Sequence, residues 1–492
     1  MKILERNAVL SVSNKDGLEK ASEFLISQGY RLFCTGGTKR YLDSKGVRCD
    51  PVETITSTPE ILGGRVKTLS FQLMAGILAR NRDDEEIRKF GSVPIDLVYV
   101  EPYDFKGRFL AGEKDLTEFI DIGGITLLRA AAKNFERVIA IPDRNGMEKV
   151  MKEMNNGEVP LSLRKELASE VFRFTSLYDY FISQWFGGSG ENFSLGGSRL
   201  LTPRYGENPH QQARVYSAFP PFFELLKEGR EISFNNIMDA WASWDLVLRL
   251  GRGSSAVVKH GSPCGAAAGE LSLKRAYESD PVSAYGGTVA LNGVLGESEA
   301  EYLKGKYVEV VIAREYSQEA LSILSKKKNL RVLMGREDCY TVPDVRTAGN
   351  VILVQEWNRK SDLNLQVKTG EINKRVDEDI RFGWEVVKSV KSNAIVLIRD
   401  GQLLSSCGGQ PNRIDAVRIT LERARTAGRI SEGAVLISDG FFPFADSIEV
   451  IGSAGIKNVA APTGSLRDDE VISAARKYGM NFVDVGERGF RH

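Results

Sequence analysis

The first fifty residues alternate between short apolar runs and helix-type spacing. Residues Ala8–Ser13 form an apolar run typical of a buried strand, and Lys15–Ser27 carries apolar residues at helical spacing before Gly29. A second strand is predicted over Arg31–Thr35, and the Gly-Gly pair that follows it opens a second predicted helix. Strand and helix in strict alternation are typical of a parallel sheet.

The pattern continues beyond this first unit and is then interrupted. Further strands are predicted at Ile95–Val100 and Val138–Ile141, with a helix from Asp121 to about Asn134 between them. The stretch Gly187–Ser198 is rich in Gly and Ser, which favours a linker, although a surface loop inside one domain has a similar composition. We therefore predict two domains, 1–190 and 198–492.

The second part mixes strand pairing types. A strand is predicted over Ala256–Lys259 and a helix start over Cys264–Gly269. Asn393–Ile398 and Gln402–Ser405 flank Asp400-Gly401, a strong hairpin signal. Three more strands, with helices between them, are predicted at Ala434–Ile437, Val459–Ala460 and Phe482–Val485. The second domain is thus expected to be α/β or α+β with some antiparallel pairing.

Small, hydroxyl-bearing and cationic residues follow the predicted N-terminal strands. Carboxyl ends of parallel strands meet at one sheet edge, where open α/β sheets bind ligands, and helix N-termini there favour anions. Taken singly, each Gly-Gly is a tight turn and each Lys a solvated side chain. Their repetition at strand ends and helix starts favours an anion pocket. Its candidate residues are Ser11, Ser13, Lys15, Thr35, Gly36, Gly37, Thr38, Arg65, Lys67, Thr68, Asp121, Gly123, Gly124 and Lys133.

A second candidate centre follows the strand Ala256–Lys259. Lys259 and His260 stand side by side at a strand end, and they form a plausible acid/base pair because a neighbouring ammonium disfavours imidazolium. A histidine that only bonds its own turn is the alternative. The Pro263-Cys264 pair is reminiscent of zinc deaminases, but the second Cys and the Glu of that pattern are absent. A zinc site is therefore not predicted.

Composition and charge narrow the functional classes. The chain has 492 residues with 66 Lys+Arg and 65 Asp+Glu, so the net charge of +1 argues against a general nucleic-acid binder. The five cysteines include no CxxC pair, which argues against a disulfide framework. We see neither an apolar signal-peptide region nor a membrane-length apolar run, and we expect a cytoplasmic protein without membrane or nucleic-acid partners.

At this point the chain resembles a known family over nearly its whole length: the bifunctional proteins that join AICAR transformylase to IMP cyclohydrolase. The most specific matches are Arg204–Gln211, which reads Arg-Tyr-Gly-Glu-Asn-Pro-His-Gln, and Lys259–Gly265, which reads Lys-His-Gly-Ser-Pro-Cys-Gly. Nine further stretches match in order: Ser11–Gly17, Thr35–Thr38, Gly63–Leu69, Ala75–Arg80, Asp121–Asn134, Lys388–Ala394, Gly409–Arg413, Phe441–Phe444 and Arg488–His492.

The resemblance implies an α/β protein. Its N-terminal domain would be a methylglyoxal-synthase-like parallel-sheet domain with cyclohydrolase activity. A transformylase domain of two cytidine-deaminase-like subdomains without zinc would follow. It also implies a homodimer with transformylase sites at the subunit interface. The substrates would be AICAR, formyl-AICAR and the co-substrate 10-formyltetrahydrofolate, and the product IMP, with no tightly bound cofactor.

The resemblance also assigns roles. In formyl transfer His260 would be the base, Lys259 would stabilise the oxyanion or protonate the leaving folate nitrogen, and Asn393 would donate to the formyl oxygen. In ring closure Lys67 would polarise the formyl oxygen, with Asp121, Tyr103 and Lys133 moving protons. The further substrate-binding candidates of the second domain are Arg204, Tyr205, His210, Arg413 and Arg488.

Three departures from the family pattern leave alternatives open. The usual Asn-Leu-Tyr-Pro-Phe is Glu101-Pro102-Tyr103-Asp104-Phe105, the usual His-Pro is Ser70-Phe71, and the usual Phe-Gly is Tyr285-Gly286. Glu101 or Asp104 could pair with Lys133 or Lys67 and keep that lysine charged. The leading hypothesis is an enzyme with two activities. A transformylase whose N-terminal domain only binds nucleotide is the alternative, and a non-catalytic ribotide sensor is a third.

Overall fold

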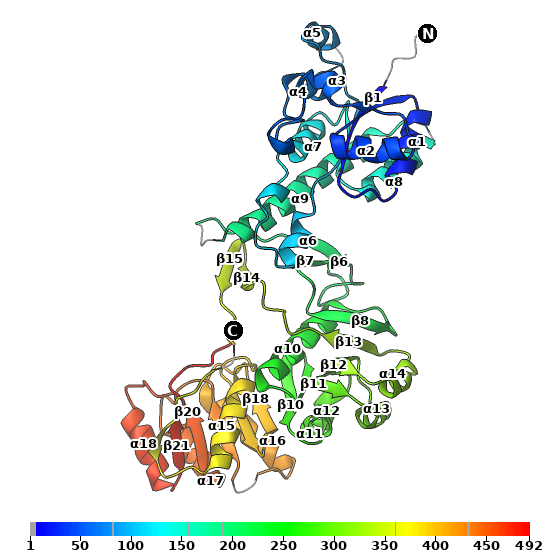
Figure 1. Ribbon diagram of the computed structural model, residues 1–492. Coiled ribbons are helices and arrows are strands. Elements are labelled where there is room, and N and C mark those ends of the chain that lie inside the picture. Colours follow the sequence, from blue (N-terminus) through cyan, green and yellow to red (C-terminus); the bar gives the residue numbers. More distant parts are fainter. Residues whose placement is uncertain (1–5, 81–82, 156, 188–190, 360, 431–432) are drawn as a thin grey trace. The chain divides into compact units, whose positions relative to one another are not determined.

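A computed structural model describes residues 6–80, 83–155, 157–187, 191–359, 361–430 and 433–492. The chain divides into two compact units, Met1–Gly197 and Ser198–His492, whose elements are labelled in Figure 1. The predicted Gly/Ser-rich linker includes 188–190, which lie outside the described residues.

Unit 1 is built on a five-stranded sheet in the order β3-β2-β1-β4-β5. Every neighbouring pair is parallel, as the alternation of strand and helix predicted. Because the chain leaves β1 toward β2 on one side and later returns to β4 on the other, the sheet has a topological switch point at β1. The strands are β1 (Arg6–Val12), β2 (Tyr30–Cys34), β3 (Asp50–Pro51), β4 (Leu97–Glu101) and β5 (Ile139–Ile141).

Alternating side chains of these strands build two cores, one on each face. Ala8, Leu10 and Val12 pack in one core with apolar residues of α1, α2 and α8. Val9 packs in the other core with residues of α4, α7 and α9. The period of two in β1 therefore makes the sheet a middle layer. The helices are α1 (Leu18–Ser27), α2 (Gly36–Ser44), α3 (Glu53–Thr56), α4 (Phe71–Leu78), α5 (Asp84–Lys89), α6 (Phe105–Leu110), α7 (Gly123–Lys133), α8 (Arg144–Asn155) and α9 (Leu161–Phe186).

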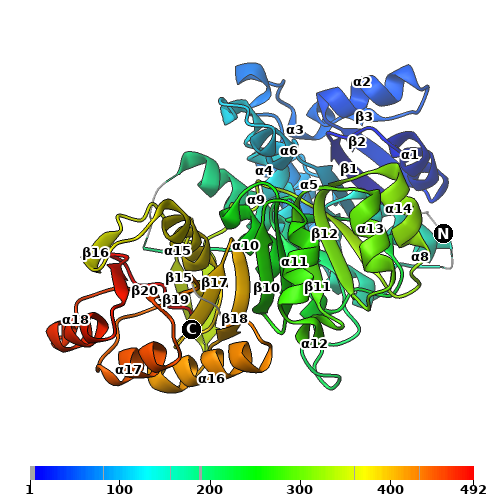
Figure 2. The same ribbon diagram turned by 90° about the horizontal axis from the view of Figure 1, so that it is seen from below.

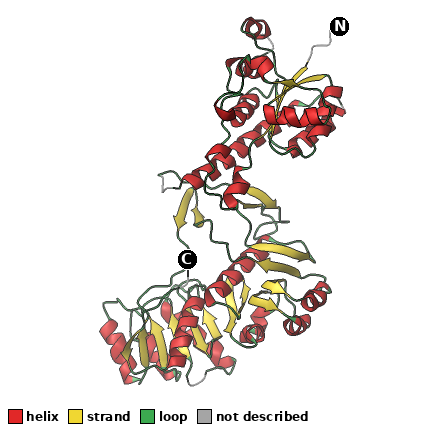
Figure 3. Cartoon of the chain, viewed as in Figure 1, coloured by secondary structure: helices red, strands yellow, loops and turns green. Residues whose placement is uncertain are grey.

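Unit 2 contains a twelve-stranded sheet made of two repeats (Figures 2 and 3). The first repeat has the order β10-β9-β11-β12-β13-β8, the second has the matching order β18-β17-β19-β20-β21-β16, and antiparallel β10 and β18 join them. The strands are β8 (Phe223–Glu228), β9 (Ser254–Lys259), β10 (Ser262–Ala268), β11 (Thr288–Leu295), β12 (Val310–Tyr316), β13 (Arg331–Gly335), β16 (Gln366–Thr369), β17 (Ile395–Arg399), β18 (Gln402–Cys407), β19 (Val435–Ser438), β20 (Asn458–Ala461) and β21 (Asn481–Asp484). The repeats agree with the expected two subdomains.

Helices cover both faces of this sheet. Trp244 of α10 and Trp384 of α15 lie in one core shared by both repeats. The other face is covered by α11, α13 and α14 in the first repeat and by α16, α17 and α18 in the second. The helices are α10 (Phe234–Leu250), α11 (Ser272–Ser279), α12 (Pro281–Ala284), α13 (Glu297–Lys304), α14 (Gln318–Ser325), α15 (Lys374–Val387), α16 (Arg413–Thr426), α17 (Asp446–Ser453) and α18 (Asp468–Lys477). Two small hairpins, β6 (Ser198–Leu201) with β7 (Val215–Ser217) and β14 (Asp344–Ala348) with β15 (Val351–Gln355), stand outside it.

One sequence expectation is wrong. The predicted helix start at Cys264–Gly269 is the strand β10, which runs antiparallel to β9. The connection is only His260-Gly261, with φ of +55° and +71°, and positive φ at both central residues is the geometry that returns a chain directly into a hairpin. The Asp400-Gly401 hairpin between β17 and β18 was predicted and is confirmed.

No helix among the described residues is long and apolar enough to cross a membrane.

Candidate active sites

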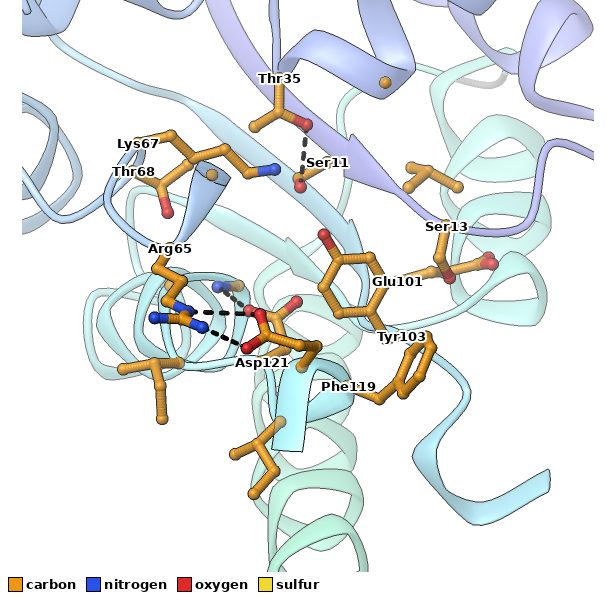
Figure 4. A pocket seen from close by; sticks show the side chains of 18 of the residues that line it. Ser11, Ser13, Thr35, Arg65, Lys67, Thr68, Glu101, Tyr103, Phe119 and Asp121 are labelled. Carbon is orange, nitrogen blue, oxygen red and sulfur yellow. Dashed lines mark hydrogen bonds and ion pairs between the residues drawn. The ribbon is translucent and has the colours of Figure 1, made fainter. Parts of the chain in front are cut away.

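Unit 1 holds a cavity of about 920 Å³ at the carboxyl edge of its sheet. Its walls come from the segments after β1, β2 and β4, the loop Glu60–Thr68 and the start of α7 (Figure 4). This is the switch point of the sheet, where open α/β folds bind ligands. Thirteen of the predicted site residues line it: Ser11, Ser13, Lys15, Thr35, Gly37, Thr38, Arg65, Lys67, Thr68, Tyr103, Asp121, Gly123 and Gly124. The predicted Gly36 is not among the lining residues.

One side of the cavity is shaped for an anion. The Thr35 hydroxyl donates to Ser11 Oγ at 3.0 Å, and Val12 N donates to Thr38 Oγ1 at 3.0 Å, so both hydroxyls are fixed. α2 begins at Gly36, and Thr35 is its N-cap residue. The Thr35 side chain does not accept a hydrogen bond from the first backbone N–H groups of this helix. Lys15 Nζ lies 3.4 Å from Thr38 Oγ1, and burial lowers the pKa of this lysine. A helix N-terminus with hydroxyls and an ammonium suits phosphate.

The cavity also brings together groups that can move protons. Burial raises the pKa of Asp121. Two effects oppose this rise: the Asp121 carboxylate accepts a hydrogen bond from Gly124 N at 2.6 Å, and the Lys67 ammonium is nearby. Tyr103 lies between Ser13 and Asp121 in Figure 4 and stacks edge-on against Phe119 at 6.3 Å. A carboxylate of raised pKa, a cation and a phenol thus face one space, which is suited to acid/base chemistry.

Close packing explains the Gly-Gly at the start of α7. A Cβ on Gly123 would come within 2.2 Å of Thr68 Oγ1. A Cβ on Gly124 would come within 2.6 Å of Asp121 Oδ2. Glycine is therefore required for the helix N-terminus to approach both the loop and the carboxylate.

Two predicted residues stand differently from the rest. Arg65 forms a two-point ion pair with Glu118, both with exposed side chains, and Arg65 Nε lies 3.2 Å from Glu118 Oε2. Lys133 is the last residue of α7, is exposed and does not line the cavity. The ten residues from Gly123 to Lys133 correspond to about 15 Å of helix.

The structure corrects the expectation for Glu101 and Asp104. Glu101 Oε1 accepts from the Tyr99 hydroxyl at 2.7 Å, and burial raises the pKa of this carboxyl. Asp104 is the N-cap of α6, where its Oδ1 accepts from Gly107 N at 2.8 Å. Among the described residues neither carboxylate is bonded to a lysine, because Tyr99 shares the face of β4 that Glu101 occupies and a helix start takes up Asp104.

In unit 2 the Lys259-His260 pair lies at the tip of the β9–β10 hairpin. The Asp239 carboxylate of α10 accepts from His260 N at 3.3 Å and from Gly261 N at 2.7 Å. Lys259 Nζ donates to Tyr285 O at 2.8 Å. Burial raises the pKa of Asp239, although the two N–H bonds oppose this. Asp239 therefore fixes the turn that presents the histidine.

Asn393 and Arg413 belong to one buried polar network. Asn393 Nδ2 donates to Gln410 O at 3.0 Å, and its Oδ1 accepts from Arg413 Nη2 at 2.6 Å. Arg413 also ion-pairs with the fully buried Asp439. A substrate could bind the Arg413 guanidinium only by displacing these bonds. In this structure the guanidinium therefore binds Asn393 and Asp439 rather than facing a substrate site.

The sheet order places Asn393 and Lys259 at one edge. β9, β10, β18 and β17 are successive neighbours, and Ser406 of β18 donates to Pro263 O at 3.3 Å across the repeat boundary. Three strand spacings put the two residues about 14 Å apart. They are too far apart for direct contact but lie at the same edge of the sheet.

The remaining predicted residues lie on loops. Arg204 lies over the Tyr205 ring at 5.4 Å and 3.6 Å from Glu231, while His210 is exposed. Asn235, one turn before Asp239 on α10, donates to Glu207 O at 3.2 Å, which fixes this loop near the His260 turn. Arg488 is exposed in the C-terminal tail, where Gly489 N donates to Asp439 O at 2.8 Å.

Sequence reasoning missed Asp239, Asp439 and Tyr178. Tyr178 of α9 donates to Phe119 O and accepts from Asp121 N at 2.7 Å. A single polar residue in an amphipathic helix gives no local signal, which explains Asp239 and Tyr178. Asp439-Gly440, two residues after the end of the predicted strand Ala434–Ile437, was a usable signal. No group of three or more His, Cys, Asp or Glu side chains that could hold a metal ion occurs in the described ranges.

Comparisons with known proteins agree with this architecture. The family model described as "AICARFT/IMPCHase bienzyme" matches residues 131–423, and the one described as "MGS-like domain" matches residues 17–126. The chain therefore belongs to the AICARFT/IMPCHase bienzyme family. Members of this family catalyse the last two steps of purine biosynthesis: the formylation of AICAR and the ring closure of formyl-AICAR to IMP.

Full-length relatives support the same conclusion. Proteins named "Bifunctional purine biosynthesis protein PurH" are 41% identical in Aquifex aeolicus, 39% in Caldicellulosiruptor saccharolyticus and 38% in Lysinibacillus sphaericus. Each match covers 99% of this chain and 100% of the relative. A solved structure titled "Crystal structure of ForH" covers 37% of this chain and 100% of its own at 37% identity, with a TM-score of 0.32.

Proposed function

We propose that the two activities are divided between the two units, with ring closure in the unit 1 cavity and formyl transfer at the Lys259-His260 edge of unit 2. The observation that carries this division is the composition of the cavity. Ser11 and Thr38, which suit an anion, line the same cavity as Lys67 and Asp121, which suit proton transfer. A ribotide whose phosphate binds at Ser11 and Thr38, the anion cradle, would direct its base toward Lys67 and Asp121.

In formyl transfer, the amino group of AICAR attacks the formyl carbon of 10-formyltetrahydrofolate and loses a proton as the bond to the folate nitrogen breaks. His260 is the proposed base because Asp239 holds its turn outward at an exposed strand end. Lys259 is the proposed cation for the oxyanion or for the leaving nitrogen. Asn393 Nδ2 already donates a hydrogen bond to Gln410 O, so it would have to donate to both that carbonyl and the formyl oxygen.

In ring closure, the carboxamide nitrogen of formyl-AICAR attacks the formyl carbon, and the oxygen leaves as water. Lys67 would polarise the formyl oxygen. Asp121, whose pKa burial raises, would take the amide proton, and Tyr103 would supply a proton to the departing oxygen. The second proton of the departing water comes from the formamido nitrogen of the substrate, which loses its N–H as the C=N bond of the new ring forms, so the side chains relay protons that the substrate itself supplies.

Formyl transfer is further proposed to occur in a homodimer, with no tightly bound cofactor. The exposed run Val351–Val354 on β15 supports association, since all four apolar side chains are about half exposed in the single chain. Light scattering of the full chain at micromolar concentration tests this part, and a monomer would refute it.

A reciprocal pair of variants tests the division. Lys67→Ala should abolish IMP formation from formyl-AICAR while formyl transfer continues. His260→Ala should lower formyl transfer by about 10²–10⁴, the range for a lost general base, and leave ring closure unchanged. Equal damage to both reactions in either variant would contradict two separate sites.

A further inference from the structure

Unit 2 contains a second basic cavity, of about 630 Å³, at the junction of its two repeats. We name it the junction cavity. It is lined by Arg275 of α11, by Arg399 and Asp400 at the β17–β18 turn, and by Arg429 after α16. Because β9 and β17 run in opposite directions, this turn lies at the sheet edge opposite to Lys259. The cavity is therefore separate from the proposed formyl-transfer site.

Two of its arginines are held in place across the repeat boundary. Arg275 of the first repeat donates to Ala268 O at 2.9 Å and to Asp400 O of the second repeat. Arg429 of the second repeat donates to Glu278 O of the first repeat and to Leu404 O at 3.4 Å. Backbone carbonyls thus orient both guanidiniums before any ligand arrives, which reduces the entropy lost on binding.

The charges around the cavity do not balance. Asp400 is its lining carboxylate, and this carboxylate is already paired with Arg375 at 2.5 Å and Arg399 at 3.3 Å. In the described part of the chain neither Arg275 nor Arg429 forms an ion pair with a carboxylate. Two oriented, half-buried guanidiniums without a counter-charge attract an anion, and their planar forks match phosphate oxygens.

We propose that the junction cavity is a second anion site, which binds a phosphate-bearing small molecule of nucleotide size. The guanidiniums of Arg275 and Arg429 supply the phosphate contacts, and a volume of about 630 Å³ is within the usual range for small-molecule sites, well above what one phosphate fills. Among the residues that line it, the carboxylate is Asp400, which Arg375 and Arg399 already hold in ion pairs, so no free acid/base group stands beside the cations. It is therefore a binding site rather than a third catalytic centre.

Calorimetric titration of the full chain with ATP, inorganic pyrophosphate and inorganic phosphate tests this proposal. A Lys15→Ala background weakens the anion cradle of unit 1, so that binding at the junction cavity is measured separately. The double variant Arg275→Gln, Arg429→Gln should lose about tenfold or more in affinity for ATP and pyrophosphate. Arg429→Lys, which keeps the charge, should retain part of it. The matched control is Arg418→Gln, Arg425→Gln on α16, whose arginines are exposed and each paired with a carboxylate.

The outcomes separate the ligand classes. Tightest binding of ATP supports a nucleotide, and equal binding of all three anions would overturn the nucleotide-size part of the proposal. Unchanged binding in the double variant, or equal loss in the control, would overturn the site itself. Retention of formyl transfer in the double variant shows that it is folded. Failure of the proposed division of activities would leave these binding results unchanged.

Discussion

Asp239 and Asp379 occupy the same position in the two repeats of unit 2 and make the same pair of bonds. Asp239 accepts from the backbone N–H groups of His260 and Gly261 at 3.3 and 2.7 Å, and Asp379 accepts from those of Asp400 and Gly401 at 3.0 and 2.6 Å. Both turns have positive φ at both residues. One scaffold thus presents a histidine in the first repeat and a carboxylate in the second.

This equivalence gives a matched pair of variants. Asp239→Ala and Asp379→Ala each leave two N–H groups without their acceptor, so each should cost about 1–3 kcal/mol of folding free energy. Only Asp239→Ala should lower formyl transfer, by more than tenfold, because it releases the turn that carries His260. Thermal unfolding and initial rates of tetrahydrofolate formation measure the two effects. Equal loss of activity in the two variants would argue that the turn has no positioning role.

Periodic signals explain why much of unit 1 was predictable. The apolar runs around Ala8–Val12 and Tyr30–Cys34 predicted neighbouring parallel strands, and these pair in register. Ser11, Thr35 and Thr38 follow the ends of these strands. Their position at the carboxyl edge of the sheet was therefore predictable, because it follows from the parallel topology alone.

Side-chain partners and turn geometry could not be predicted from the sequence. Arg413 was expected to contact substrate, but its guanidinium meets Asp439, 26 positions along the chain. The sequence left open a pair between Glu101 and Lys133 or Lys67, but its partner is Tyr99, two residues away on the same face of β4. The helix predicted at Cys264–Gly269 failed because the two-residue hairpin places a non-glycine residue, His260, at positive φ.

Glu101, which stands where the family usually has Asn, should have little effect on the rate of ring closure. Glu101→Gln keeps an acceptor for the Tyr99 hydroxyl and removes no partner of Lys67, so the rate of IMP formation from formyl-AICAR should stay within a few-fold of that of the unaltered chain. Asp104→Ala removes the α6 cap and should cost about 1 kcal/mol of stability with little effect on rate. Loss of ring closure in Glu101→Gln would show that this carboxylate acts in the reaction.

The pH dependence of ring closure should report Asp121. Burial holds its pKa above the ordinary value of about 3.9. A base must be ionised, so kcat/KM for formyl-AICAR should fall as the pH is lowered through this raised pKa. The residual activity of Asp121→Asn should lack that acidic limb. A limb that persists in the variant would assign the titration to another group.

Both reactions should survive removal of metal ions. The proposed steps move protons between side chains and substrate, and His260 and Cys264 do not form part of any metal-ligand cluster within the described ranges. Dialysis against a chelator, followed by separate assays of the two reactions and metal analysis of the protein, tests this prediction. Stoichiometric zinc that is lost together with formyl transfer would overturn it.

The central claim is that one chain performs both reactions at separate sites. Its most direct test supplies the full chain with AICAR and 10-formyltetrahydrofolate and follows tetrahydrofolate, formyl-AICAR and IMP over time. Lys67→Ala serves as the control for uncatalysed ring closure. We predict that IMP accumulates in step with tetrahydrofolate in the unaltered chain, while formyl-AICAR accumulates only in the variant. Tetrahydrofolate and formyl-AICAR accumulating from the unaltered chain, with IMP no faster than in Lys67→Ala, would contradict the account.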